Sequence, residues 1–166
     1  LFMFSFILVI FHIVGYAPFG DRSLAYDDGY WQYMDFFAFY KDILNGIQSP
    51  LYSLSNGLGQ PTLPVLMYYL ASPWNLIIQL FKKTELHQFF DILNALKIAC
   101  SFVTCFYYLK KRFNNSIEPL ITYSLSVSYA LMQYNIAQSM CPMWLDGVYM
   151  LPLIMLGVYR LVWGEK

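Results

Sequence analysis

The chain has 166 residues, of which 58% are hydrophobic, 20% are aromatic and only 12% are charged. A soluble domain carries about a quarter charged residues, so this composition excludes an ordinary water-soluble protein and predicts a membrane protein whose main partner is the lipid bilayer. Ten basic and ten acidic residues give a net charge of zero, which argues against nucleic acid as a partner.

The first predicted membrane span covers residues 1–17, which are almost wholly apolar and end before Pro18. At 1.5 Å per residue this stretch is about 26 Å long, slightly short of the ~30 Å hydrocarbon layer. A signal peptide is the alternative, but the segment 15–18 lacks a good small-x-small cleavage site. We therefore expect a retained span, and we interpret the chain as the N-terminal part of one transmembrane domain of a larger protein.

Three further apolar stretches are long enough to cross a bilayer, at about 87–109, 119–139 and 147–163. The first ends at a basic cluster, residues 110–112, and the second begins at Pro119, a residue favoured at helix starts. The third is flanked by Arg160 and Lys166, whose long side chains can reach the lipid headgroups.

The long stretch between the first two spans, 18–86, contains two further helical patterns. Residues 33–46 have a broad apolar face with charges elsewhere, which is typical of an amphipathic helix lying in the membrane interface. Residues 62–81 are mostly apolar but are interrupted by Ser72-Pro73 and Asn75. Because proline disrupts helical hydrogen bonding, this segment forms either two short helices at the membrane face or one kinked span.

The distribution of basic residues decides between these two readings of 62–81. If the segment does not cross, five basic residues of the second half lie inside, and only Lys82 and Lys83 lie outside. The positive-inside rule favours this arrangement. We therefore predict an all-α polytopic protein with both termini in the cytoplasm and an external loop over 18–86. The turn 140–146 then lies on the same face as Asp28.

Asp27 and Asp28 are the first candidates for chemistry, because they follow a span and precede an amphipathic helix. One reading is a turn with a helix N-cap, since aspartate accepts backbone N–H bonds there. The other is a carboxylate at the membrane surface that acts as a general base or a metal ligand. In that case Gln32 and Tyr33 could orient a substrate hydroxyl.

Asp146 and Trp144 lie in the second external turn, and each has two readings. Trp144 is either an interfacial anchor or a substrate contact. Asp146 either caps a helix that starts at Gly147 or approaches Asp28 as a second functional carboxylate.

Lys97 is a charged residue inside a predicted span. Polar residues recur around it at three- or four-residue spacing and form one stripe: Asp91, Asn94, Lys97, Ser101, Thr104 and Tyr108. Charges within membranes usually face the protein interior or a wet cavity. Lys97 is therefore either half of a structural ion pair, with Asp91 or with another helix, or a ligand for an anionic group such as a lipid-linked phosphate.

The ordered set of motifs resembles the YfhO family of bacterial multispanning membrane proteins, over essentially all 166 residues. Each motif is weak alone, but their shared order is specific. The motifs are Tyr16-Ala17-Pro18-Phe19-Gly20-Asp21, Asp28-x-x-x-Gln32-Tyr33, Asn56-Gly57-Leu58-Gly59, Tyr68-Tyr69-Leu70-Ala71-Ser72-Pro73-Trp74-Asn75-Leu76, Leu96-Lys97-Ile98, Tyr107-Tyr108-Leu109-Lys110-Lys111-Arg112 and Met143-Trp144-Leu145-Asp146.

This resemblance implies a GT-C type glycosyltransferase architecture in a bacterial plasma membrane, with the site on the extracytoplasmic face. It also implies a polyprenyl-phosphate-linked sugar as donor and lipoteichoic acid or a related cell-surface polymer as acceptor. By position, Asp28 matches the acidic loop residue on which such enzymes rely, and Asp146 is a weaker match for a second catalytic role. The substrate-binding candidates are Asp27, Gln32, Tyr33, Tyr68, Tyr69, Lys97 and Trp144.

The chemistry of such a transfer suits these residue types. An acceptor hydroxyl needs a base to attack the anomeric carbon, whereas the departing phosphate needs positive charge or hydrogen-bond donors. Lys97 or a divalent metal on Asp28 are the candidates for the second task, and single displacement inverts the anomeric carbon. The competing functions are a lipid or solute transporter, with the Lys97 stripe lining its pathway, and a non-catalytic membrane scaffold.

Overall fold

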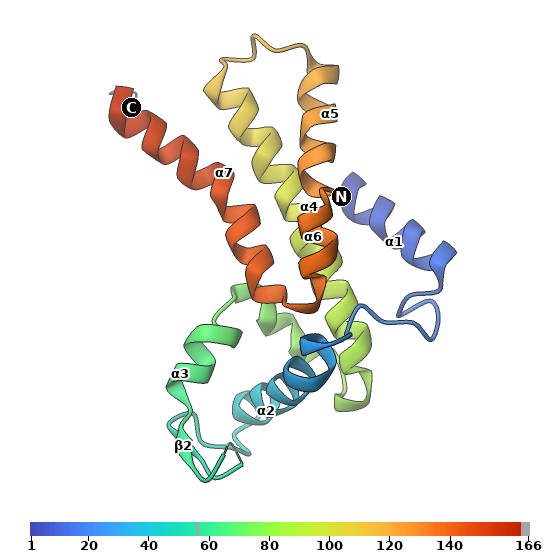
Figure 1. Ribbon diagram of the computed structural model, residues 1–166, viewed down its shortest axis with the longest axis vertical. Coiled ribbons are helices and arrows are strands. Elements are labelled where there is room, and N and C mark those ends of the chain that lie inside the picture. Colours follow the sequence, from blue (N-terminus) through green and yellow to red (C-terminus); the bar gives the residue numbers. More distant parts are fainter. Residues whose placement is uncertain (56, 164–166) are drawn as a thin grey trace.

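The computed structural model describes residues 1–55 and 57–163, and it is mostly helical (Figure 1). The helical fold class predicted from the sequence is therefore confirmed. The predicted loop residue Asn56 and the predicted headgroup contact of Lys166 lie outside the described residues. The elements are α1 (Phe2–Val14), η1 (Gly29–Tyr33), α2 (Met34–Leu44), β1 (Tyr52–Ser53), β2 (Gln60–Pro61), α3 (Leu63–Val65), η2 (Leu66–Leu70), η3 (Pro73–Leu80), η4 (Lys83–Glu85), α4 (Leu86–Arg112), α5 (Pro119–Ala130), α6 (Gln133–Ala137), η5 (Gln138–Met140) and α7 (Pro142–Trp163).

Helix α4 is the centre of the molecule and contacts α1, α5 and α7 (Figure 1). Among the described residues, two segments are long and apolar enough to cross a membrane, 83–112 and α7. The buried face of α4 includes Ala95 and Ala99, four residues apart, and their small side chains let neighbouring helices approach closely. α4 thus supplies the surface against which the other long helices pack.

Helix α1 is shorter than the span predicted over 1–17. Gly15, with φ of +81°, ends it in the left-handed conformation that glycine adopts without strain. Met3, Ile7 and Phe11 lie four residues apart on one face and are buried in a cluster with residues of α4. The exposed face of α1 is also apolar, as expected for a helix next to lipid.

The span predicted over 119–139 does not run as one helix. α5 ends at Ala130, and Met132 has an extended backbone before the short helix α6. The physical reason is the buried side chain of Asn135, whose Nδ2 donates to the carbonyls of Tyr129 (3.1 Å) and Ala130 (2.9 Å). This amide satisfies carbonyls that a continuing helix would otherwise satisfy.

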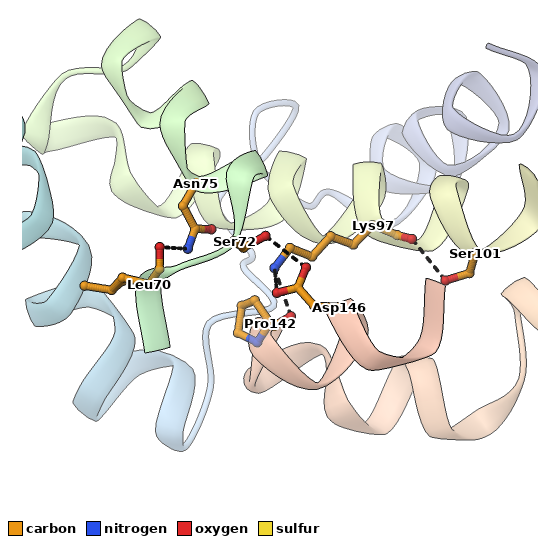
Figure 2. A network of polar contacts seen from close by, with 7 residues as sticks. All are labelled: Leu70, Ser72, Asn75, Lys97, Ser101, Pro142 and Asp146. Carbon is orange, nitrogen blue, oxygen red and sulfur yellow. Dashed lines mark hydrogen bonds and ion pairs between the residues drawn. The ribbon is translucent and has the colours of Figure 1, made fainter. Parts of the chain in front are cut away.

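The region 18–86 folds against the first turns of α4, at the end of the molecule where α2 and α3 are seen (Figure 1). The amphipathic pattern predicted over 33–46 corresponds to the end of η1 followed by α2. The segment 62–81 forms two short helical pieces, 63–70 and 73–80. Ser72 is extended before Pro73, and the buried Asn75 donates to the carbonyl of Leu70 at 3.1 Å (Figure 2). The two-helix alternative is therefore the one that the structure adopts.

Helix α7 begins at Pro142, five residues earlier than the helix predicted over 147–163. Proline suits this place because the first helical N–H groups have no partner within the helix. The consequence is that Asp146 lies within α7, so the alternative in which it caps a helix starting at Gly147 is wrong.

Candidate functional site

Asp28 lies just before η1, in a turn that brings it against the start of α7. The turn is closed by bonds from the N–H groups of Gly29 and Trp31 to the carbonyls of Tyr26 and Asp27. Gly29 is needed for the close approach, because a Cβ there would lie 3.1 Å from the carbonyl oxygen of Met140. Asp27 is exposed, with φ of +47°, whereas Asp28 is half-buried. The turn thus separates the two carboxylates, and Asp28 is the one that faces the protein.

The side chain of Asp28 contacts an amide and a thiol. Its Oδ1 accepts a hydrogen bond from Gln32 Nε2 at 2.8 Å, and its Oδ2 lies 3.7 Å from Cys141 Sγ. Asp28 occupies the N-cap position of η1, and the predicted turn is present, but its side chain makes no cap hydrogen bond, so the side-chain capping in that alternative is wrong. Side-chain contacts therefore hold the carboxylate in place, and its oxygens do not cap the backbone N–H groups of η1.

Cys141 is a site residue that sequence reasoning missed, since nothing in its local sequence marks it. The residue is buried, and burial followed by the negative charge on Asp28 raises the pKa of its thiol to about 11. Cys141 therefore stays protonated at neutral pH and presents a weak S–H donor to Asp28.

Asp146 joins three parts of the chain through its two oxygens (Figure 2). Its Oδ2 accepts from Lys97 Nζ of α4 at 2.9 Å, and its Oδ1 accepts from Ser72 Oγ at 2.9 Å. Lys97 Nζ also donates to the carbonyl of Pro142 at 3.0 Å. Only 1% of the Lys97 side chain is exposed, against 25% of Asp146. The ion pair is therefore buried on the lysine side and open on the carboxylate side.

The polar stripe of α4 faces the protein interior as predicted for Asp91, Asn94, Lys97 and Ser101, all of which are buried. However, Asp91 is not the partner of Lys97, so that alternative is wrong. Its Oδ1 instead accepts from Ser23 Oγ and from the Leu24 N–H, both at 2.9 Å. Asp91 thereby ties the segment after α1 to α4, and the second alternative, an ion pair with another helix, describes Lys97.

An open pocket of about 420 Å³ adjoins Asp146. Burial raises the pKa of Tyr69, with smaller contributions from Tyr68 and Asp28, so the Tyr69 hydroxyl keeps its proton and can donate a hydrogen bond. Asp146 lines this pocket and Asp28 does not. The pocket is lined by Met67, Tyr68, Tyr69, Ala71, Ser72, Pro73, Met143, Asp146, Tyr149 and Met150.

Two other predicted site residues lie elsewhere. Tyr33 is 1% exposed, and its ring packs among Phe37, Tyr69 and Phe90, so it is a core residue and does not reach a substrate. Trp144 is 47% exposed and does not line the Asp146 pocket, in agreement with an interfacial anchor.

The residues around Asp28 do not form a metal site by themselves. In the described ranges 1–55 and 57–163, no three His, Cys, Asp or Glu side chains gather closely enough to hold a metal ion. Asp28 shares its surroundings with an amide and a protonated thiol, whereas Mg²⁺ prefers several oxygen ligands. Asp146 already has the Lys97 ammonium as its counter-ion.

Long apolar helices with a charged pair buried between two of them are typical of helical membrane proteins. Residues 1–166 match the model of the family described as bacterial membrane protein YfhO, so the chain belongs to this family. The resemblance stated from the motifs is thereby confirmed. No curated protein and no solved structure matches the chain.

Proposed function

We propose that this chain contributes to the site of a membrane glycosyltransferase. In this proposal a sugar passes from a polyprenyl-phosphate-linked donor to a hydroxyl of an extracytoplasmic acceptor such as lipoteichoic acid. The observation that supports it best is the convergence of Asp28 and Asp146 at the start of α7. The Asp28 side chain contacts Cys141, the residue just before α7, and Asp146 lies in the first turns of that helix.

Asp28 is the proposed general base. The acceptor oxygen bonds to the anomeric carbon while the bond from that carbon to the phosphate oxygen breaks, and Asp28 takes the hydroxyl proton. The electron pair leaves with the polyprenyl phosphate, and the anomeric carbon is inverted. Gln32 fixes the orientation of Asp28 through Oδ1, while Oδ2 faces only a weak thiol donor and keeps lone pairs for the proton.

Asp146 has a different role in this proposal. Because Lys97 and Ser72 each occupy one of its oxygens, Asp146 is suited to accepting hydrogen bonds from substrate hydroxyls rather than to proton transfer. Lys97 is too deeply buried to meet a phosphate and acts as a positioning residue for Asp146. The hydroxyl groups of Tyr68 and Tyr69 are the nearby donors for the departing phosphate.

A transporter is less well supported by the same contacts. Its pathway would have to follow the polar stripe of α4, but Lys97 is 1% exposed and donates to two partners on α7. A transporter should also depend on Lys97 more than on Asp28, which separates the two functions experimentally.

The test compares Asp28→Asn with Asp27→Asn in the intact protein. We expect Asp28→Asn to lower transfer of labelled sugar from the lipid-linked donor by about 10²-fold or more, as for loss of a general base. Asp27→Asn is the matched control, because Asn tolerates positive φ and residue 27 is exposed. Both variants should keep the thermal stability of the wild type in detergent. Equal activity of the two variants would contradict the proposal.

A further inference from the structure

A second pocket, of about 360 Å³, lies against η1 and α2 and shares no lining residue with the Asp146 pocket. Three aromatic rings, a carboxylate, an amide and a hydroxyl surround it. The lining residues are Trp31, Gln32, Asp35, Phe36, Phe39 and Ser55.

The arrangement follows from helical spacing. Trp31, Asp35 and Phe39 recur every four residues along η1 and α2, as do Gln32 and Phe36, so they share one face. This face alternates aromatic rings with polar groups instead of being uniformly apolar. Trp31 is 74% exposed, which leaves most of its ring accessible.

These groups match the surface of a sugar ring. A pyranose presents C–H groups with partial positive charge on one face, which pack against the negative face of an aromatic ring. Its hydroxyl groups can donate to the Asp35 carboxylate and to Gln32 Oε1. The Asp35 side chain lines the pocket and is exposed, so its carboxylate oxygens are accessible to a ligand. Its negative charge disfavours an anionic ligand.

Gln32 connects this pocket to Asp28. Its Nε2 donates to Asp28 Oδ1 at 2.8 Å, while the side chain lines the pocket. A sugar bound there lies one side chain away from the proposed base. We propose that the Trp31–Asp35 pocket binds a neutral pyranose ring of one of the two substrates; the link to Asp28 rests on the proposed transferase function.

The test measures saturation-transfer NMR between the intact protein in nanodiscs and methyl glycosides of neutral hexoses, with glycerol 3-phosphate as the anionic comparison. We expect saturation of the glycosides but not of glycerol 3-phosphate. Trp31→Ala and Asp35→Asn should each weaken the glycoside affinity by about tenfold, roughly the loss of one good contact. Trp163→Ala is the matched control, because Trp163 is 70% exposed and lies at the far end of α7.

Two further measurements are needed. The first distinguishes the donor sugar from the acceptor sugar, and the second distinguishes sugar binding in this pocket from the proposed transferase function. If the polyprenyl-phosphate sugar displaces the methyl glycoside, the pocket binds the sugar of the donor substrate. If it does not, the pocket binds a sugar of the acceptor substrate. Asp28→Asn should strongly lower transfer yet retain glycoside binding. The binding result can therefore be interpreted even if the proposed transferase function is wrong.

Glycoside binding that is equal in Trp31→Ala and wild type would overturn the inference. So would an absence of saturation together with strong quenching of Trp31 fluorescence by brominated lipids, since Trp31 would then be a membrane contact.

Discussion

At the scale of single residues, the site depends on which of two adjacent carboxylates faces the protein. Asp27 and Asp28 are chemically identical, and their sequence spacing does not distinguish them. The distinction comes from the positive φ of Asp27 and from Gly29, whose missing Cβ lets the turn approach Met140. As a result Asp28 meets Cys141 while Asp27 is exposed.

The contact between Asp28 and Cys141 has a measurable consequence. With a pKa of about 11, only about one Cys141 thiol in a thousand is ionised at pH 8. Iodoacetamide should therefore alkylate it slowly in a protein whose Cys100 and Cys105 are replaced by alanine. Asp28→Asn removes a negative charge that disfavours the thiolate, so the midpoint of the rate against pH should fall.

Asp27→Asn should move this midpoint less, because Asp27 is the smallest of the contributions that raise the pKa of Cys141. The pH midpoint, rather than the rate at one pH, is the measurement, since it is insensitive to access of the reagent. An unchanged midpoint in Asp28→Asn would show that the two side chains do not meet.

At the scale of elements, the long apolar stretches and the proline break at Ser72-Pro73 could be predicted, whereas interruptions made by a single non-proline residue could not. The hydropathy of α4 and α7 is summed over many residues, so it survives local exceptions. The break after Ala130 is made by one side chain, Asn135, and the end of α1 by Gly15. Such single-residue effects are lost when hydropathy is averaged over a window of many residues.

The same limit applies to the site. Charge bias predicts that Asp28 and Asp146 lie on one membrane face, and the polar stripe identifies Lys97 as inward-facing, which its burial confirms. The pairing of Lys97 with Asp146 instead of Asp91 depends on how α4 and α7 are set against each other, which hydropathy does not specify. Cys141 becomes part of the site for the same reason.

The α4–α7 ion pair predicts an asymmetry in stability. Asp146→Leu leaves the Lys97 ammonium buried with only the Pro142 carbonyl, and we expect a loss of roughly 2–4 kcal/mol. Lys97→Met leaves Asp146 with Ser72 and partial access to water, so its cost should be smaller, on the order of 1 kcal/mol.

Denaturation midpoints in mixed detergent micelles measure both losses. The double variant should recover part of the stability lost in Asp146→Leu, because no buried charge is left without a partner. A Lys97→Met variant that is less stable than Asp146→Leu would contradict the ion-pair geometry.

At the scale of the whole molecule, the region 18–86 and the helices α4 and α7 form the site only together. Ser72 comes from the break between η2 and η3, Lys97 from α4 and Asp146 from α7 (Figure 2). The basic cluster Lys110–Arg112 forms the last turn of α4, beyond Lys97, which lies near the middle of the helix. This separation suits a protein with its chemistry at one membrane surface and its basic anchors at the other.

The most direct test labels single cysteines from outside intact cells, in a protein whose native cysteines are replaced. The positions are 28, 83, 111 and 146, and the reagent is a thiol label that does not cross membranes. Asp28→Cys, Lys83→Cys and Asp146→Cys should react from outside, and Lys111→Cys should react only after the membrane is permeabilised. Labelling of positions 28 and 146 from opposite sides of the membrane would contradict the account.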